Sequence, residues 1–349
     1  MFVFFERNSD ARRTTVLLRP PRPSPAEDGP GAPADEALGV DAKQAKHLRM
    51  STHDVSLDVD AALSSAPIAA AGKPRATDMG PVAKTMFIPL WARAMEARKA
   101  RPLVLDPRAL EICESVDFDF TIFRRAYGTQ VGCVLRGLLY DQWVSAFLSR
   151  HPHGTVVELG AGLSTRFERI DNGRARWVDV DLPDALALRR RWVTPSERRV
   201  FLETSVVGGD WPDALKRLAA GPYCFVAEGM LMYLEPSDVR ALFVRLADAF
   251  GPTELVFDSI GTAAVRHQRL HDSMRHMMDA PFRWGTDDVR DIESWDRRLV
   301  LQDTATLPEI ARRFRDRVPR RHRAVGALVE LAWPSFARSY RLGRAVIGA

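Results

Sequence analysis

Short apolar runs alternate with amphipathic stretches from residue 155 to the end of the chain. A short apolar run bounded by turn residues predicts a buried strand, whereas apolar residues that recur every three or four positions predict a helix. Strands are expected at residues 155–159, 176–183, 199–203, 223–227, 254–257, 298–302 and 339–347. Strands that alternate with helices predict an α/β fold with a doubly wound, seven-stranded, mostly parallel sheet.

Helical patterns fill the region before this sheet, which predicts a helical subdomain over residues 79–150. Helices are expected there at residues 81–101, 107–116 and 130–150. Another amphipathic helix is expected over residues 261–280, within a helical insertion at 259–296 that follows the fifth strand. The aromatic residues of this insertion either cover a substrate pocket or belong to the core.

Residues 1–78 form a segment rich in proline, alanine and glycine. We expect this segment to be disordered, because it holds too little apolar surface to offset the entropy of ordering the chain. Met50 opens a more ordinary stretch, so the natural start lies near it or residues 1–49 are a dispensable tail.

The composition, with 46% hydrophobic residues, suits a globular core. The three cysteines show no metal or disulfide spacing, which favours a reducing compartment and a cytoplasmic protein. No apolar run is long enough to span a bilayer, so no membrane partner is expected. The net charge is +5, and ten arginines fall within residues 312–344. Because no nucleic-acid-binding motif accompanies them, a solvated basic face is favoured over a nucleic-acid interface.

A glycine turn follows the first strand in the stretch Glu158-Leu159-Gly160-Ala161-Gly162. The dinucleotide fingerprint requires a third glycine, and Thr165 stands in its place. An acidic residue before two glycines instead suits S-adenosylmethionine (SAM), whose amino-acid end carries a carboxylate and an ammonium group. The alternative is an ordinary strand–turn–helix junction without a ligand.

Polar residues follow the ends of five successive expected strands: Glu158, Asp181, Ser205, Glu228 and Asp258. Ligands of parallel sheets bind at the carboxyl ends of the strands, so these side chains are expected at one binding edge. Asp181 lies 21 residues after Gly160, which suits a ribose ligand. Alternatively, it caps the following helix. Asp179 would face the same side, but it lies farther from the strand's end.

The sequence leaves open the roles of Arg136, of three histidines and of Tyr233. Arg136 is either a surface arginine whose stem packs on the helix, or a buried cation for a ligand carboxylate. His267 and His271 share a face of the expected helix, but no third ligand accompanies them, so a zinc site is disfavoured. These histidines, His276 or Tyr233 could act as a general base, and the sequence selects none of them.

From Met79 onward the chain resembles the leucine carboxyl methyltransferase family, in particular its bacterial branch of polyketide-biosynthesis O-methyltransferases (tetracenomycin type). The resemblance rests on the order and spacing of six stretches. They are Ala92–Glu96, Asp106–Ala109, Val134–Arg136, Val157–Arg166, Asp179–Pro183 and Ala227–Leu234.

The resemblance implies a class I SAM-dependent methyltransferase with a Rossmann-like sheet. Arg136 would bind the methionine carboxylate, Gly160, Ala161 and Gly162 the amino-acid end, and Asp181 with Leu182 the ribose region. Glu158 and Glu228 would lie beside the cofactor. Eukaryotic members have an acidic residue near the adenine where this chain has Ser205, which leaves that contact open.

The predicted function is SAM-dependent methyl transfer to a carboxylate or phenolic oxygen of a small molecule. The alternatives are a protein C-terminal carboxyl methyltransferase and a catalytically degenerate SAM-binding regulator. A nicotinamide oxidoreductase is disfavoured by Thr165.

Overall fold

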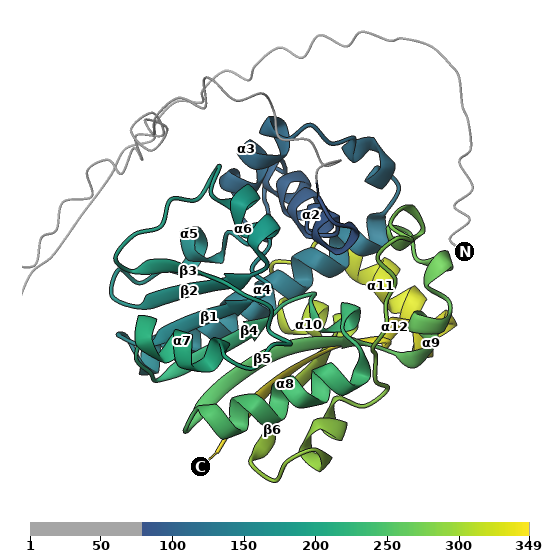
Figure 1. Ribbon diagram of the computed structural model, residues 1–349. Helices are drawn as coiled ribbons and strands as arrows, with labels where there is room; N and C mark the ends of the chain where they lie inside the picture. The colour runs from purple at the N-terminus through teal and green to yellow at the C-terminus, as the bar shows by residue number, and fades with distance from the viewer. Residues whose placement is uncertain (1–78, 349) are drawn as a thin grey trace, which may run out of the picture. The chain divides into compact units, whose positions relative to one another are not determined.

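The computed structural model describes residues 79–348. The expectations about residues 1–78 lie outside the described residues. The described part contains a seven-stranded sheet with the strand order β3-β2-β1-β4-β5-β7-β6 (Figure 1). Its strands are β1 Thr155–Leu159, β2 Arg176–Asp181, β3 Arg199–Glu203, β4 Tyr223–Ala227, β5 Thr253–Ile260, β6 Leu299–Thr306 and β7 Tyr340–Ile347. Within this sheet only β7 runs in the direction opposite to the other six strands, which confirms the predicted fold class.

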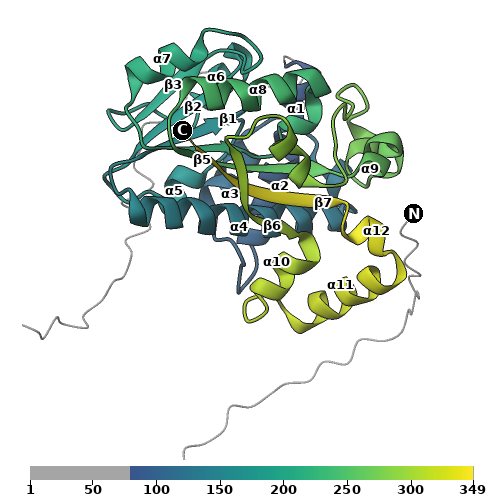
Figure 2. The same ribbon diagram turned by 90° about the horizontal axis from the view of Figure 1, so that it is seen from below.

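Helices cover both faces of the sheet, and successive residues of β1 show how they are divided (Figure 2). Val157 packs in a core cluster with α7 (Trp211–Leu218) and α8 (Pro236–Ala249). Its neighbour Val156 packs on the other face, with α4 (Tyr127–Arg150) and α10 (Leu307–Arg313). A strand buried on both faces needs a continuous apolar run, which explains why the sequence pattern located β1.

Amino-terminal elements form a third core cluster, together with the insertion that follows β5. They are α2 Phe87–Ala97, α3 Pro107–Ser115 and the 3₁₀ turn η2 Phe120–Phe123. Helix α1, Pro81–Lys84, has no buried residue. The single helix expected over residues 81–101 is wrong, because α1 and α2 are separate. Pro89 explains the break: it has no N–H to donate to the preceding turn, so it is accommodated only in the first turn of a new helix.

The insertion after β5 also differs from the prediction of one helix over residues 261–280. It contains α9 Thr262–Arg266 and the 3₁₀ turns η4 Gln268–Leu270, η5 Met274–His276 and η6 Val289–Ser294. His271 accepts a hydrogen bond from its own segment, from the N–H of Met274, at 3.4 Å. Asp272 instead bonds to Thr129 at the start of α4. Such side-chain bonds compete with helix formation.

Strands β5 and β6 are longer than predicted, because β7 pairs with both along its length. Asp258 and Ser259 therefore lie within β5, not after it. The carboxyl-terminal helices are α11 Arg320–Ala332 and α12 Pro334–Ala337, and the remaining ones are α5 Arg166–Ile170 and α6 Pro183–Arg189. Within residues 79–348, no helix is both long and apolar enough to cross a membrane.

Candidate functional site

The glycine turn after β1 adopts a backbone that other residues rarely reach. Gly160 and Gly162 have φ angles of +66° and +46°, which L-residues with a side chain adopt only at a cost. The N–H groups of Gly160 and Ala161 both donate to the carbonyl of Val180, at 2.8 and 3.2 Å. A Cβ at Gly160 would lie 2.6 Å from Cγ of Met230. The turn is therefore a cradle whose shape depends on glycine.

Asp181 connects the end of β2 to this turn. Its Oδ2 accepts the N–H of Gly162 at 2.7 Å, and its Oδ1 accepts the N–H of Leu182 at 2.8 Å. Each carboxylate oxygen keeps a second lone pair, which could accept a ribose hydroxyl. Burial raises the pKa of Asp181 above its ordinary value, although these two N–H groups and Arg189 oppose the shift. Asp179, by contrast, lies inside β2 and pairs with Arg189 and Arg199, both at 3.0 Å.

Two buried arginines hold the outer side of the turn, and sequence reasoning assigned neither a role. Arg189 donates to the carbonyls of Gly162 and Ser164, both at 2.8 Å, while its Nε pairs with Asp179. Arg93 donates to the carbonyl between them, that of Leu163, at 2.7 Å. Three consecutive carbonyls are thus fixed by guanidinium groups. We call Arg93 and Arg189 the arginine clamp.

The ends of β1, β4 and β5 meet in a buried ion network around Arg136 and Arg166. Nε of Arg136 lies 2.9 Å from Glu228, and its Nη1 lies 3.1 Å from Asp258. Arg166 is fully buried and pairs with Glu158 at 2.6 Å and with Glu228. Three of the five expected edge residues are therefore brought together. Among residues 79–348, Nη2 of Arg136 makes no hydrogen bond, so it can meet a ligand carboxylate.

Arg136 is buried, so it is not a solvated surface arginine. Its guanidinium pairs with Glu228 and Asp258, and its binding of a ligand carboxylate stays a prediction. Burial would raise the pKa of Glu228, but Arg136 and Arg166 outweigh it and hold this pKa well below its usual range. Burial instead dominates at Glu158 and Asp258 and raises their pKa values. The two arginines therefore favour the ionised form of Glu228, and an ionised carboxylate suits a ligand ammonium group.

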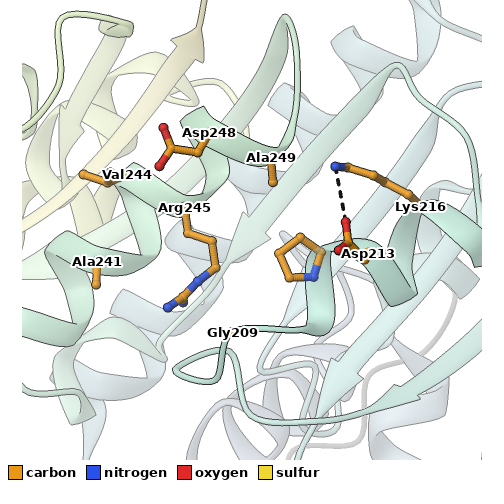
Figure 3. A pocket seen from close by; sticks show the side chains of 9 residues that line it. Gly209, Asp213, Lys216, Ala241, Val244, Arg245, Asp248 and Ala249 are labelled. Carbon is orange, nitrogen blue, oxygen red and sulfur yellow. Dashed lines mark ion pairs between the residues drawn. The ribbon is translucent and has the colours of Figure 1, made fainter.

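Ser205 is not part of this network. It is exposed, and its hydroxyl accepts the N–H of Val207 at 3.2 Å within the loop after β3. Arg245 of α8 donates to the carbonyl of Val206 at 3.0 Å and so ties this loop to the helix. Arg245 also lines a surface groove of about 450 Å³ between α7 and α8, together with the ion pair of Lys216 and Asp213 (Figure 3).

The residues considered as general bases differ in their proton affinity. Burial raises the pKa of Tyr233 to about 12, so this phenol stays protonated near neutral pH. Burial lowers the pKa of His271, which keeps the imidazole neutral there. His271 lies edge-on to Phe282, and Phe282 lies against Tyr233, with ring centroids 5.9 and 5.5 Å apart. Of these two groups, only His271 can accept a proton at neutral pH.

The set of charged groups fits SAM: an ionised carboxylate for its ammonium group, an arginine nitrogen for its carboxylate, and an acidic residue for its ribose. The described residues contain no group of three or more His, Cys, Asp or Glu side chains that could hold a metal. The three cysteines are free thiols.

Comparisons with known proteins agree with this chemistry. The model of the leucine carboxyl methyltransferase family matches residues 87–247. The tetracenomycin polyketide synthesis O-methyltransferase of Streptomyces glaucescens is 31% identical over 214 residues, covering 61% of this chain and 78% of that protein. The chain belongs to the leucine carboxyl methyltransferase family. It is an enzyme that uses SAM as its methyl donor.

More distant relatives carry the same cofactor in their names. A candidate SAM-dependent methyltransferase of Mycobacteroides abscessus is 27% identical, covering 54% of this chain and 68% of that protein. Among solved structures, a candidate methyltransferase from Thermobifida fusca aligns with 74% of this chain and 94% of its own, at 18% identity and a TM-score of 0.49.

Sequence reasoning missed the arginine clamp and Arg166, although Arg93 and Arg166 lie within family stretches that it examined. Arg166 follows the glycine turn after Leu163, Ser164 and Thr165. An arginine within an otherwise apolar helical pattern, as at Arg93 in α2, is the signal that could have indicated a buried partner.

Proposed function

We propose that this methyltransferase acts on an oxygen of a small aromatic molecule of the polyketide type. The similarity to the tetracenomycin enzyme carries the proposal, because it extends over 78% of that protein. We further propose that Arg136, Glu158, Gly160, Gly162, Asp181 and Glu228 hold the cofactor. Ala161, Leu182 and Ser205 would line the same edge of the sheet.

The acceptor would lie between the helical cap, residues 79–150, and the insertion after β5. The core cluster shared by these two regions is rich in methionine and aromatic side chains. Examples are Met232, Met274 and Phe282, which are buried, and the partly buried Met86. Methionine adapts its shape and makes favourable contacts with aromatic rings, so this composition supports an apolar aromatic acceptor.

When bound, SAM supplies an activated methyl group for direct displacement. The residues of this chain would align the acceptor oxygen with that group and exclude water. A carboxylate acceptor is already ionised near pH 7, whereas a phenol has a pKa of about 10 and benefits from a base. We propose His271 as the group that takes the phenol proton.

The test is incubation of the full chain with methyl-labelled SAM and a panel of phenols and aromatic carboxylic acids. Mass spectrometry would identify the methylated oxygen. We expect label in at least one small acceptor and none in peptides that end in leucine. Label in the peptide carboxylate alone would instead establish a protein carboxyl methyltransferase. Binding of SAM without transfer to any acceptor would favour a degenerate regulator.

A further inference from the structure

Helix α11 carries an apolar stripe that faces solvent. Its Val325, Leu328 and Leu331 are 49, 64 and 82% exposed, and Trp333 just beyond its end is 59% exposed. Residues three apart lie on one side of a helix, so Val325, Leu328 and Leu331 form a single stripe. Figure 2 shows α11 at the outside of the described part, beside α10 and α12.

The other side of α11 is fixed to neighbouring elements. Glu330 accepts hydrogen bonds from Arg312 of α10 at 2.6 Å and from Arg338 beyond α12 at 3.4 Å. Glu330 lies on the side of the helix opposite to Leu328, so these contacts leave the apolar stripe uncovered.

Positive charge lies beside the stripe. Residues 312–323 contain seven arginines and a single acidic residue, Asp316. Arg312, Arg313 and Arg315 are in ion pairs, with Glu330, Asp303 and Asp316. Arg315, Arg317 and Arg320 are exposed, and Arg320 has no ion-pair partner among residues 79–348. A helix that combines exposed leucines, a tryptophan and flanking arginines has the composition of an interfacial helix.

We propose that α11 and the adjoining arginines bind the surface of an anionic lipid bilayer. The helix would lie in the plane of the interface, with Leu328 and Leu331 at the acyl boundary and the arginines at the head groups. A second copy of the chain is disfavoured, because its arginines would face those of the first copy. Nucleic acid is disfavoured, because its phosphate backbone offers the leucines no apolar surface.

The test is sedimentation of the full chain with vesicles. One set contains phosphatidylcholine alone, and the other contains equal parts of phosphatidylcholine and phosphatidylglycerol. We expect binding to the anionic vesicles only, with weaker binding as salt rises. Replacing both Leu328→Glu and Leu331→Glu should lower the partition coefficient at least about tenfold for each leucine. Leu270→Glu is the matched control, since Leu270 is 72% exposed on η4.

Circular dichroism and SAM calorimetry would establish that the double variant is folded. Three results would overturn the proposal: no binding to anionic vesicles, equal binding to neutral vesicles, or unchanged binding of the double variant. Light scattering could give a fourth result that overturns the proposal. A wild-type dimer that the double variant converts to a monomer would assign the stripe to a second copy of the chain.

Discussion

Arg189→Lys tests whether the arginine clamp sets the cofactor affinity. Arg189 is 1% exposed and makes three charge-assisted hydrogen bonds, to Asp179 and to the carbonyls of Gly162 and Ser164. Lysine keeps the charge but has a single nitrogen, so it can replace about one of these three bonds. Each lost hydrogen bond to a charged group lowers the free energy of unfolding by about 1.5–3 kcal/mol.

Two lost bonds therefore predict about 3–6 kcal/mol of destabilisation. If about 1.5 kcal/mol of this destabilisation affects the ordered conformation of the glycine turn, that binding-competent conformation is less populated. The affinity for SAM then drops about tenfold. Calorimetry with SAM measures the affinity, and thermal unfolding measures the stability. The matched control is Arg190→Lys, because Arg190 is the next residue but pairs with Glu203 at the surface.

We expect the Arg190 variant to bind SAM as the wild type does, since exposed ion pairs contribute little. An Arg189 variant that melts at a lower temperature yet binds SAM normally would refute the role of the clamp in cofactor binding. Arg189 would then stabilise only the fold.

Three more predictions follow from single groups. Gly160→Ala should weaken SAM binding more than tenfold. Gly173→Ala should not, because Gly173 also has a positive φ but no atom lies within 4 Å of the added Cβ. Equal losses of SAM affinity in calorimetry would contradict this prediction. Asp106→Asn should destabilise by about 3–5 kcal/mol at pH 7. Burial raises the pKa of Asp106, but Arg93 and Arg169 outweigh it and lower that pKa. The free energy of unfolding in urea should therefore be higher for the wild type than for the variant at pH 7, and this difference should disappear as pH falls below about 3.9. A difference that does not depend on pH would refute the pairing. Burial raises the pKa of Cys113 to about 12, so Ellman's reagent at pH 8 should react with it slowly until the protein unfolds; rapid reaction of the native protein would contradict the burial.

The sequence predicted the bounds of the five-residue strands better than those of the longer ones. Strands β1, β3 and β4 begin and end where the pattern placed them. Strand β5 was predicted too short, because Asp258 has the appearance of a strand terminus. Its charge is instead met inside the sheet by Arg136 of α4 and Tyr340 of β7, which are distant in the chain.

Some parts of the candidate site could be predicted from the sequence and others could not. The glycine turn and Asp181 are local signals, because their spacing along one strand–turn–helix unit carries the chemistry. The arginine clamp is a long-range contact: Arg93 lies 70 residues before the carbonyl that it holds. A single sequence can indicate that Arg93 has a buried partner, but it does not identify the carbonyl of Leu163 as that partner. The prediction of one helix in the insertion was wrong for a local reason, because the hydrogen bond that the His271 side chain accepts interrupts the helical pattern.

Calorimetry of SAM binding to the wild type and to Asp181→Asn tests the central claim most directly, namely that the cofactor lies at the glycine turn and the end of β2. The control is Glu203→Gln, which removes a carboxylate from the end of the adjacent strand β3. We predict that the Asp181 variant binds at least about tenfold more weakly, because it loses a charge-assisted acceptor, and that the control binds normally. Wild-type affinity in the Asp181 variant would contradict this account of the cofactor site.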